Sequence, residues 1–446
     1  MSESDKVRYE KSETWTLFAS YSTQVVQMSV ITLFDKSFLQ SLTVDESVWF
    51  DRFFNSVVCP IFYVETLADL SKKPREDRTA EAEVRIIAAK FPEMSGSPCA
   101  DHYSMARLDV LGIFQPSMDG RIPRSGGRNV VGGNRVGVVF DEGPEMAAFR
   151  RWQNAEFYEV EWCFAAGWRA ALNATDLTQI ATALRTAGIT AQSCKSFAEA
   201  KRLAKSLIQS TYKIFERLRF AVAFFNIEQP YHEQIIKRWN LTGKPPLHEF
   251  APYAAFVLTV EVFFHIALAA SLISPARPSN RTDIGYLFYL PFCMAFVSSD
   301  RLHKQTAPLF LRDDQEFIWG LDLKADLRRL NAHYQAAFSE AERERGLIGL
   351  VGAPPIDGGY LVTELWKRHL RPEALYDRDL TETMSAEAQA KLVEELTAFT
   401  EGAPLLPGQE IADGDGIEAV TVERRISKKK GSWWQVPKDL PEQDGI

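Results

Sequence analysis

Cysteine is scarce and scattered in this chain, and the short motifs of several enzyme classes are missing. The 446 residues include five cysteines without a CxxC pair, namely Cys59, Cys99, Cys163, Cys194 and Cys293. This spacing argues against a disulfide framework and against a cysteine-rich zinc site. The histidines show no HExxH spacing, and no GxSxG nucleophile elbow occurs. The sequence therefore gives no support to a zinc protease of that type or to a hydrolase with that elbow.

An excess of positive charge is also lacking. The 51 Lys and Arg residues against 59 Asp and Glu give a net charge of −8, so any contact with nucleic acid needs a local basic patch. The first residues, MSESDKVRYEKSETW, contain no apolar run of the signal-peptide type. With the scattered cysteines, this predicts a cytoplasmic protein. The length suits two or three domains, or one domain with a large insertion.

One apolar run is long enough to test the soluble interpretation. Ala251–Ile273 reads APYAAFVLTVEVFFHIALAASLI, about the length that spans a bilayer. It carries Glu261 and His265 near its middle, and such side chains are costly in lipid. We therefore expect a buried helix and no membrane contact, with a membrane-associated helical protein as the alternative.

Runs of β-branched and apolar residues predict the strands of an α/β protein. Buried strands are expected at Gln24–Phe34 and Val57–Val64, and shorter ones at Met294–Ser298 and Glu316–Trp319. Pro60 within the second run suggests a bulge or a sheet edge. Helical periodicity predicts further elements, among them Val44–Phe54, Thr79–Lys90 and Arg301–Phe310.

Four acidic residues fall at the ends of these predicted elements. Asp35 follows the first strand, Glu65 follows the second, Asp283 opens a helical run and Asp300 follows the third strand. In an open parallel sheet, ligands bind at the carboxyl ends of the strands. If the three strands are parallel neighbours, all four carboxylates belong at one edge.

Four converging carboxylates without Lys or Arg between them would repel one another. A hard dication relieves that repulsion, and Mg²⁺ or Mn²⁺ prefers such oxygen ligands. A bound ion can activate water for attack on a phosphodiester. The pattern thus predicts a metal site. Alternatively, each acid has a structural role: Asp35, Asp283 and Asp300 as helix caps, and Glu65 as a first-turn partner of a helix dipole.

Three segments in this order resemble the PIN and PIN-like domain nucleases. They are LFDKSFL at Leu33–Leu39, YVETLADL at Tyr63–Leu70, and the Asp283–Asp300 stretch with its Ser-x-Asp ending, FVSSD. The resemblance implies metal-dependent endoribonuclease activity, with Asp35, Glu65, Asp283 and Asp300 as the catalytic and metal-binding acids. The 217 residues between Glu65 and Asp283 depart from compact family members.

The expected architecture follows from this departure. We expect an α/β fold with a PIN-like parallel sheet flanked by helices, split by a large, mainly helical insertion. Residues 1–74 would form the first half of the core, 75–281 the insertion, 282–320 the second half, 321–400 a helical extension and 401–446 a disordered tail. The insertion could bind a protein partner. A non-catalytic PIN-fold interaction protein is the rival hypothesis.

Weaker signals concern contacts with RNA. Four arginines in the Gly-rich stretch 112–143 could hold a phosphate backbone, namely Arg121, Arg124, Arg128 and Arg135. GRNVVGG at Gly127–Gly133 lacks the Lys-Ser/Thr of a phosphate loop. The basic run Arg424–Lys430 precedes Trp433 and Trp434 and could touch RNA, although a solvated tail is the default. His303 could assist at a metal site, although a helix-surface position is the default.

Overall fold

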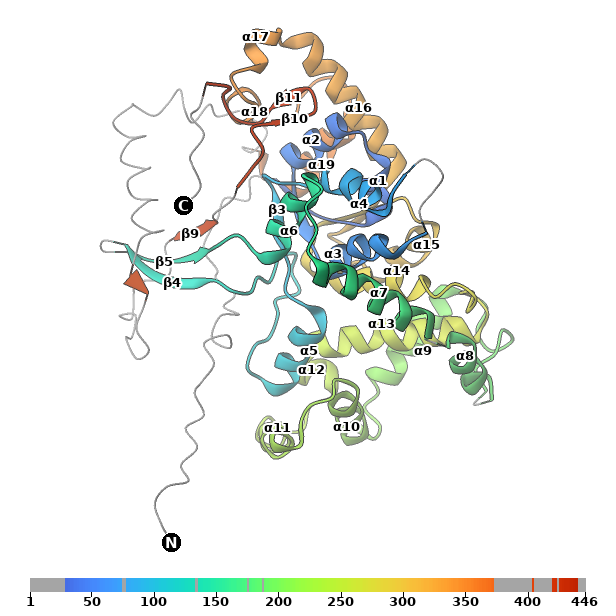
Figure 1. The fold of residues 1–446 in the computed structure, drawn as a ribbon. Helices are drawn as coiled ribbons and strands as arrows, with labels where there is room; N and C mark the ends of the chain where they lie inside the picture. The colour runs from blue at the N-terminus through green and yellow to red at the C-terminus, as the bar shows by residue number, and fades with distance from the viewer. Residues whose placement is uncertain are drawn as a thin grey trace.

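A five-stranded, all-parallel sheet forms the centre of the fold (Figure 1). The computed structural model describes residues 29–73, 78–132, 135–174, 176–186, 188–372, 403–404, 419–422 and 425–439. The sheet order is β3-β2-β1-β6-β7, with β1 at Val30–Phe34, β2 at Phe54–Val58, β3 at Gly96–Pro98, β6 at Ala295–Ser298 and β7 at Glu316–Trp319. The predicted α/β class is confirmed, and the first three predicted strands are parallel neighbours.

The central strand is buried along its whole length. All five residues of β1, VITLF, are buried, as expected for a parallel strand covered on both faces. Leu33 pairs with Val57 of β2 and with Phe296 of β6. This register fixes the carboxyl ends of β1 and β6 side by side.

The helices that flank this sheet come from two parts of the chain, one before and one after the mainly helical middle. The N-terminal ones are α1 (Lys36–Ser41), α2 (Val44–Phe53), α3 (Pro60–Leu67), η2 (Ala68–Ser71), α4 (Ala80–Ala88) and α5 (His102–Leu111). The later ones are α14 (Asn280–Gly285), η4 (Tyr286–Phe292), α15 (Arg301–Phe310), α16 (Gly320–Ala337), α17 (Glu340–Arg343), α18 (Leu347–Leu350) and α19 (Leu361–His369). A capping box between Thr43 and Glu46 starts α2. The boundaries predicted for α15 are confirmed.

Two predicted boundaries in the first half of the chain are wrong. The expected strand Val57–Val64 ends at Val58, and Pro60 opens α3. Proline is favoured in the first turn of a helix because its missing N–H has no partner there. The sheet also continues past residue 74, because β3 pairs with β2 from within the stretch expected to be an insertion.

The middle of the chain is mainly helical. Its helices are α6 (Pro144–Gln153), α7 (Glu159–Ala174), α8 (Leu177–Thr186), α9 (Phe197–Ile208), α10 (Ile214–Phe224), η3 (Gln229–Tyr231), α11 (His232–Leu241), α12 (Leu247–Phe250) and α13 (Pro252–Ala269). Before them, β4 (Arg128–Gly132) and β5 (Arg135–Phe140) pair antiparallel within the Gly-rich stretch 112–143. These strands also pair with β8 (Ala403–Pro404) and β9 (Ala419–Val422).

The apolar helix α13 lies largely inside the protein. Its length and hydropathy would allow it to cross a membrane, but 78% of that window is buried among other elements. Glu261, 4% exposed, pairs with Arg281. Asp109 Oδ2 accepts backbone hydrogen bonds from Tyr253 at 2.8 Å and Ala254 at 3.0 Å, at the first turn of α13. These contacts are those of a core helix, as predicted.

The C-terminal segment packs against the first helices of the fold. Strands β10 (Lys429–Lys430) and β11 (Trp433–Trp434) form a short hairpin. The Trp433 side chain is fully buried against the Trp49 ring, and both indoles donate to Asn331 Oδ1, at 2.9 and 3.0 Å. The predicted disordered tail is therefore wrong for residues 425–439, because Trp433 fills a place in the core. Arg424 and the rest of the tail beyond 401, apart from β8 and β9, lie outside the described residues.

Candidate functional site

The candidate site lies at the carboxyl ends of β1 and β6, where the order of the strands reverses. Strands β2 and β3, which follow β1 in the chain, lie on one side of it. The later strands β6 and β7 lie on its other side. Ligands of open α/β sheets bind in the crevice at such a crossover. Asp35 follows β1 directly, and Asp300 follows β6 by two residues. Two of the four predicted acids thus occupy the expected edge.

The Asp35 carboxylate is buried and surrounded by hydrogen-bond donors. It caps α1 by accepting from Phe38 N at 2.9 Å, and it accepts from Ser37 Oγ and Ser298 Oγ, each at 2.7 Å to Oδ2. His303 Nδ1 lies 3.2 Å from the same oxygen. A carboxylate offers about four lone-pair sites, so these four donors occupy its capacity. The predicted capping role of Asp35 is confirmed.

His303 is the buried positive partner of Asp35. The expectation of a surface position is wrong, because the imidazole is 0% exposed. Its Nε2 lies 2.6 Å from the Asp283 carbonyl oxygen and donates to it, which leaves Nδ1 facing Asp35 and Ser298. Burial lowers the pKa of His303, but the hydrogen bond to Asp35 and the charges of Asp35 and Asp283 outweigh burial and raise it to about 9. The ring therefore carries a proton on both nitrogens at neutral pH.

Ser298, His303 and Asp35 do not form a nucleophilic triad. In such a triad, the serine and the acid meet different nitrogens of the imidazole. Here both meet Nδ1, and the backbone carbonyl occupies Nε2. Ser298 is also fully buried, and its Oγ accepts from Asp300 N at 2.9 Å. The trio holds the edge of the sheet together and presents no serine nucleophile.

Glu65 reaches the same region from the second half of α3. It is not a first-turn residue, as the sequence suggested, because α3 already begins at Pro60. Its Oε2 accepts a 2.7 Å hydrogen bond from the hydroxyl of Tyr286. Burial raises the pKa of Glu65, against the opposing charge of Lys36 and the bond from Tyr286. The surroundings of this side chain thus favour its neutral form more than water would.

Lys36 supplies a second buried cation that the sequence argument overlooked. Its ammonium group pairs with Asp69 Oδ2 at 2.7 Å and donates to the Glu65 carbonyl at 3.1 Å. The Lys36 side chain is 6% exposed. The assumption that no Lys or Arg lies among the acids is therefore wrong. The clue was its place next to Asp35, which directs it toward the same sheet edge.

Asp283 connects the four acids electrostatically. Burial raises its pKa to about 7; the positive charge of His303 opposes this, and the charges of Glu65, Asp300 and Asp35 add to it. The carboxylate lies in the first turn of α14 and does not cap it. No described residue donates a hydrogen bond to it. The three other acids therefore all act on Asp283, whose carboxylate no described hydrogen bond holds in place.

Asp300 combines a capping role with a free oxygen. Its Oδ1 accepts from Leu302 N at 2.6 Å and from His303 N at 3.3 Å, which starts α15. The predicted cap is confirmed. Among the described contacts, its Oδ2 and the Glu65 Oε1 accept no hydrogen bond. These oxygens and the Asp283 carboxylate remain available to a ligand.

These donors suit a hard dication in type but do not form a closed metal site. Oxygen ligands surround Mg²⁺ at about 2.1 Å and Ca²⁺ at about 2.3–2.6 Å. Among the residues that the structure describes, no three His, Cys, Asp or Glu side chains lie close enough together to hold a metal ion. Glu65, Asp283 and Asp300 would have to rotate toward one another first. Asp35 would have to give up one of its donors.

The arginines expected to hold a phosphate backbone have local partners instead. Arg121 Nε donates to Asp119 at 2.9 Å, and Arg124 lies over an aromatic ring of β5. Arg128 Nε lies 3.7 Å from an aspartate that follows β5. The side chain of Arg135 lies outside the described residues. Residues 128–132 of the weak phosphate-loop candidate are strand β4.

Comparison with known proteins adds no family to these observations. No protein-family model, no curated protein and no solved structure matches the chain.

Proposed function

We propose that the chain is a divalent-cation-dependent endonuclease that hydrolyses phosphodiester bonds, with RNA as the expected substrate. The observation that carries the proposal is Asp283, whose carboxylate is raised to a pKa of about 7 while three other acids act on it at the crossover of a parallel sheet. Carboxylates with perturbed pKa values cluster at functional sites, and the crossover of a parallel sheet is where ligands bind. The order of the segments that resemble PIN-like nucleases supports the same conclusion.

In this proposal the acids have distinct roles. Glu65, Asp283 and Asp300 would hold Mg²⁺ or Mn²⁺ through their free oxygens after rotating toward one another, and Asp35 would join them on giving up one of its donors. A bound dication supplies activated water and shields the charge that develops on the phosphoryl group. Ser298 and His303 fix the orientation of Asp35, because they contact its Oδ2 from β6 and α15. Lys36 limits the repulsion between Glu65 and Asp69.

Cleavage of labelled single-stranded RNA by the purified full chain in Mn²⁺ tests the activity. Asp283→Asn and Asp300→Asn are expected to lose at least about a hundredfold in rate, since each removes a ligand charge while keeping the shape of the side chain. Asp313→Asn is the matched control, because Asp313 is exposed and lies outside the acidic edge. Equal cleavage by all four proteins would refute the assignment.

Titration of Mn²⁺ into the same proteins tests the ion site without cleavage. The wild type and Asp313→Asn should bind, and Asp283→Asn should bind at least about tenfold more weakly. Raising the pH from 6 to 8 should strengthen binding by the wild type, because Asp283 must lose its proton, whose pKa is about 7.

A non-catalytic interaction protein on the same fold is the second candidate. It is favoured by the saturated hydrogen bonding of Asp35 and by the two buried cations, His303 and Lys36, which already offset part of the negative charge. Absence of Mn²⁺ binding at millimolar concentration, with no cleavage, would select this candidate over the nuclease.

A further inference from the structure

Helices α9, α10 and α11 carry an excess of positive charge in a chain that is acidic as a whole. Residues 195–244 contain ten Lys and Arg against four Glu, a net charge of +6, so the remainder carries −14. Seven of these cations are exposed, namely Lys195, Arg202, Lys205, Lys213, Arg219, Lys237 and Lys244. Exposed positive charge is therefore concentrated in this segment, although the chain as a whole is acidic.

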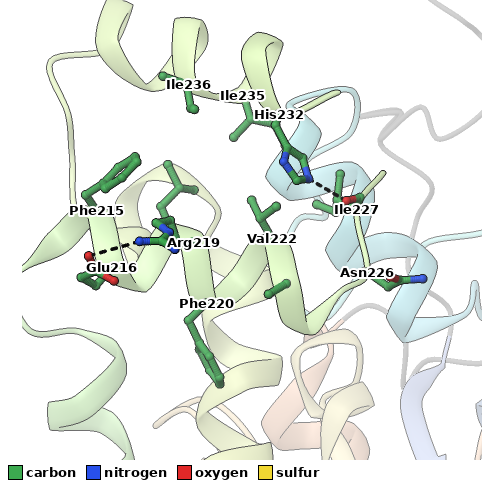
Figure 2. Close-up of a pocket in the computed structure, with 12 residues that line it drawn as sticks. Phe215, Glu216, Arg219, Phe220, Val222, Asn226, Ile227, His232, Ile235 and Ile236 are labelled. Carbon is green, nitrogen blue, oxygen red and sulfur yellow. Dashed lines mark hydrogen bonds and ion pairs between the residues drawn. The ribbon is translucent and has the colours of Figure 1, made fainter. Parts of the chain in front are cut away.

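Large apolar side chains are exposed among these cations. The Tyr212 side chain is 71% exposed and that of Phe220 is 45% exposed, and the others on this surface are Phe215, Tyr231, Ile236 and Leu241. A hollow of about 550 Å³ separates α10 from α11 (Figure 2). Phe215 and Val222 line it from α10, and Ile235 and Ile236 from α11. We call these exposed cations and apolar side chains the basic–aromatic surface.

The protein itself neutralises few of these cations. Arg219 lies 3.6 Å from Glu216, and both side chains are largely exposed, so this pair contributes little. Lys205, Lys237 and Lys244 form no ion pair within the described part of the chain. Arg238 differs, because it is partly buried and donates to backbone carbonyls of α5. Lys205, Lys237 and Lys244 are thus free to meet a negatively charged partner, whereas the Lys213 ammonium lies 5.4 Å from the ring centre of Tyr212.

We infer that the basic–aromatic surface binds single-stranded nucleic acid. Surfaces of this kind place cations along the phosphate backbone and offer aromatic rings on which bases stack. Four exposed rings can serve in this way, namely those of Tyr212, Phe215, Phe220 and Tyr231. The bases of a duplex are already stacked on one another, so only the bases of a single strand can stack on these rings. The inference rests on the proposed nuclease function and makes its substrate class a single strand.

The fold links this surface to the acidic edge. Helix α9 packs against both α13 and α15, and Lys201 Nζ lies 5.8 Å from the ring centre of Phe310 in α15. Helix α15 begins directly after Asp300. Figure 1 shows α10 and α11 on the side of the molecule away from α16 and α17, with α9 between them and α15. Helix α9 thus connects this part of the molecule to the last turn of α15, the helix that Asp300 caps at its other end.

Binding of a fluorescent poly-uridine oligonucleotide to the full chain in EDTA tests the inference, because EDTA prevents metal-dependent cleavage. The double variant Lys205→Glu, Lys237→Glu should bind at least about tenfold more weakly. The slope of log K against log salt should fall by about 1.4, since each lost phosphate contact on a single strand contributes about 0.7. Arg371→Glu, an exposed cation outside this surface, should change neither value.

A second double variant, which removes two aromatic rings, tests stacking. Tyr212→Ala combined with Phe220→Ala should weaken binding by at least about tenfold, as expected for loss of base stacking. Phe164→Ala is the control, because Phe164 on α7 is 46% exposed, close to the 45% of Phe220. Far-ultraviolet circular dichroism confirms that each variant is folded.

Three results would overturn the inference: wild-type affinity in both double variants, equal losses in the controls, or competition by duplex RNA or poly-glutamate as strong as that by single-stranded RNA. Failure here with intact, Asp283-dependent cleavage would leave the proposed function standing. Binding with no cleavage in Mn²⁺ would refute the nuclease and keep the binding surface.

Discussion

The buried pair of His303 and Asp35 makes the stability of the fold depend on pH. The change that tests this is His303→Gln, which keeps an amide that can donate to the Asp283 carbonyl but cannot be protonated. Asp35 keeps its donors from Ser37, Ser298 and the backbone of α1. The variant therefore removes the charge and leaves most of the local hydrogen bonding.

The expected magnitude follows from the pKa of His303, which rises from 6.5 to about 9 on folding. Each pKa difference of one corresponds to about 1.4 kcal/mol, so the charged pair contributes about 3 kcal/mol. Below pH 6.5, the folded and unfolded chains both hold the proton and the contribution is complete. Between 6.5 and 9 only the folded chain holds it, so the contribution falls as pH rises and is lost above the folded pKa.

Urea unfolding of both proteins at pH values from 6 to 9.5, followed by tryptophan fluorescence, measures this contribution. The free energy of unfolding of the wild type, relative to His303→Gln, should decline by about 3 kcal/mol over that range. Taking the difference cancels groups that titrate in both proteins, such as Lys90, whose pKa burial lowers to about 8. Asp35→Asn should abolish the same decline. A difference that stays constant with pH would refute the charged pair.

Three further predictions concern packing and caps. Gly320→Ala should lower the free energy of unfolding by about 1–3 kcal/mol, because its new methyl group would meet Ser299 Oγ and backbone. Gly349→Ala should leave the stability unchanged, because open space surrounds Gly349. Thermal unfolding of both variants compares them. Asn331→Leu should cost about 2–4 kcal/mol in urea unfolding by leaving two buried indole N–H groups without an acceptor. The stability of Asp109→Asn relative to the wild type should increase as the pH rises from about 4 to 7. Burial raises the pKa of Asp109 from 3.8 to about 7, so over this range the folded wild type keeps a proton that the unfolded chain releases, and the wild type loses stability. A constant difference in urea unfolding across that range would contradict the last expectation.

Periodicity predicted the parts of the fold that are local. The apolar run ending at Phe34 and the helix Arg301–Phe310 appear where expected, because burial pattern and capping residues are properties of neighbouring residues. The prediction of a strand over Val57–Val64 was wrong because it also used only local pattern. A continuous apolar run does not distinguish a strand from a buried helix, and Pro60 fits both a strand edge and a helix start.

The sequence alone determined that Asp35 and Asp300 follow β1 and β6, whose carboxyl ends share one edge because the strands are parallel neighbours; Glu65 and Asp283 lie on α3 and α14 instead. Only the tertiary structure decided which positive groups face those acids. His303 is 268 residues from Asp35, and its burial depends on how α15 packs against the sheet. Lys36 follows Asp35 in sequence, but its partner Asp69 comes from η2. The charge balance of the site is a property of long-range packing, which no local pattern encodes.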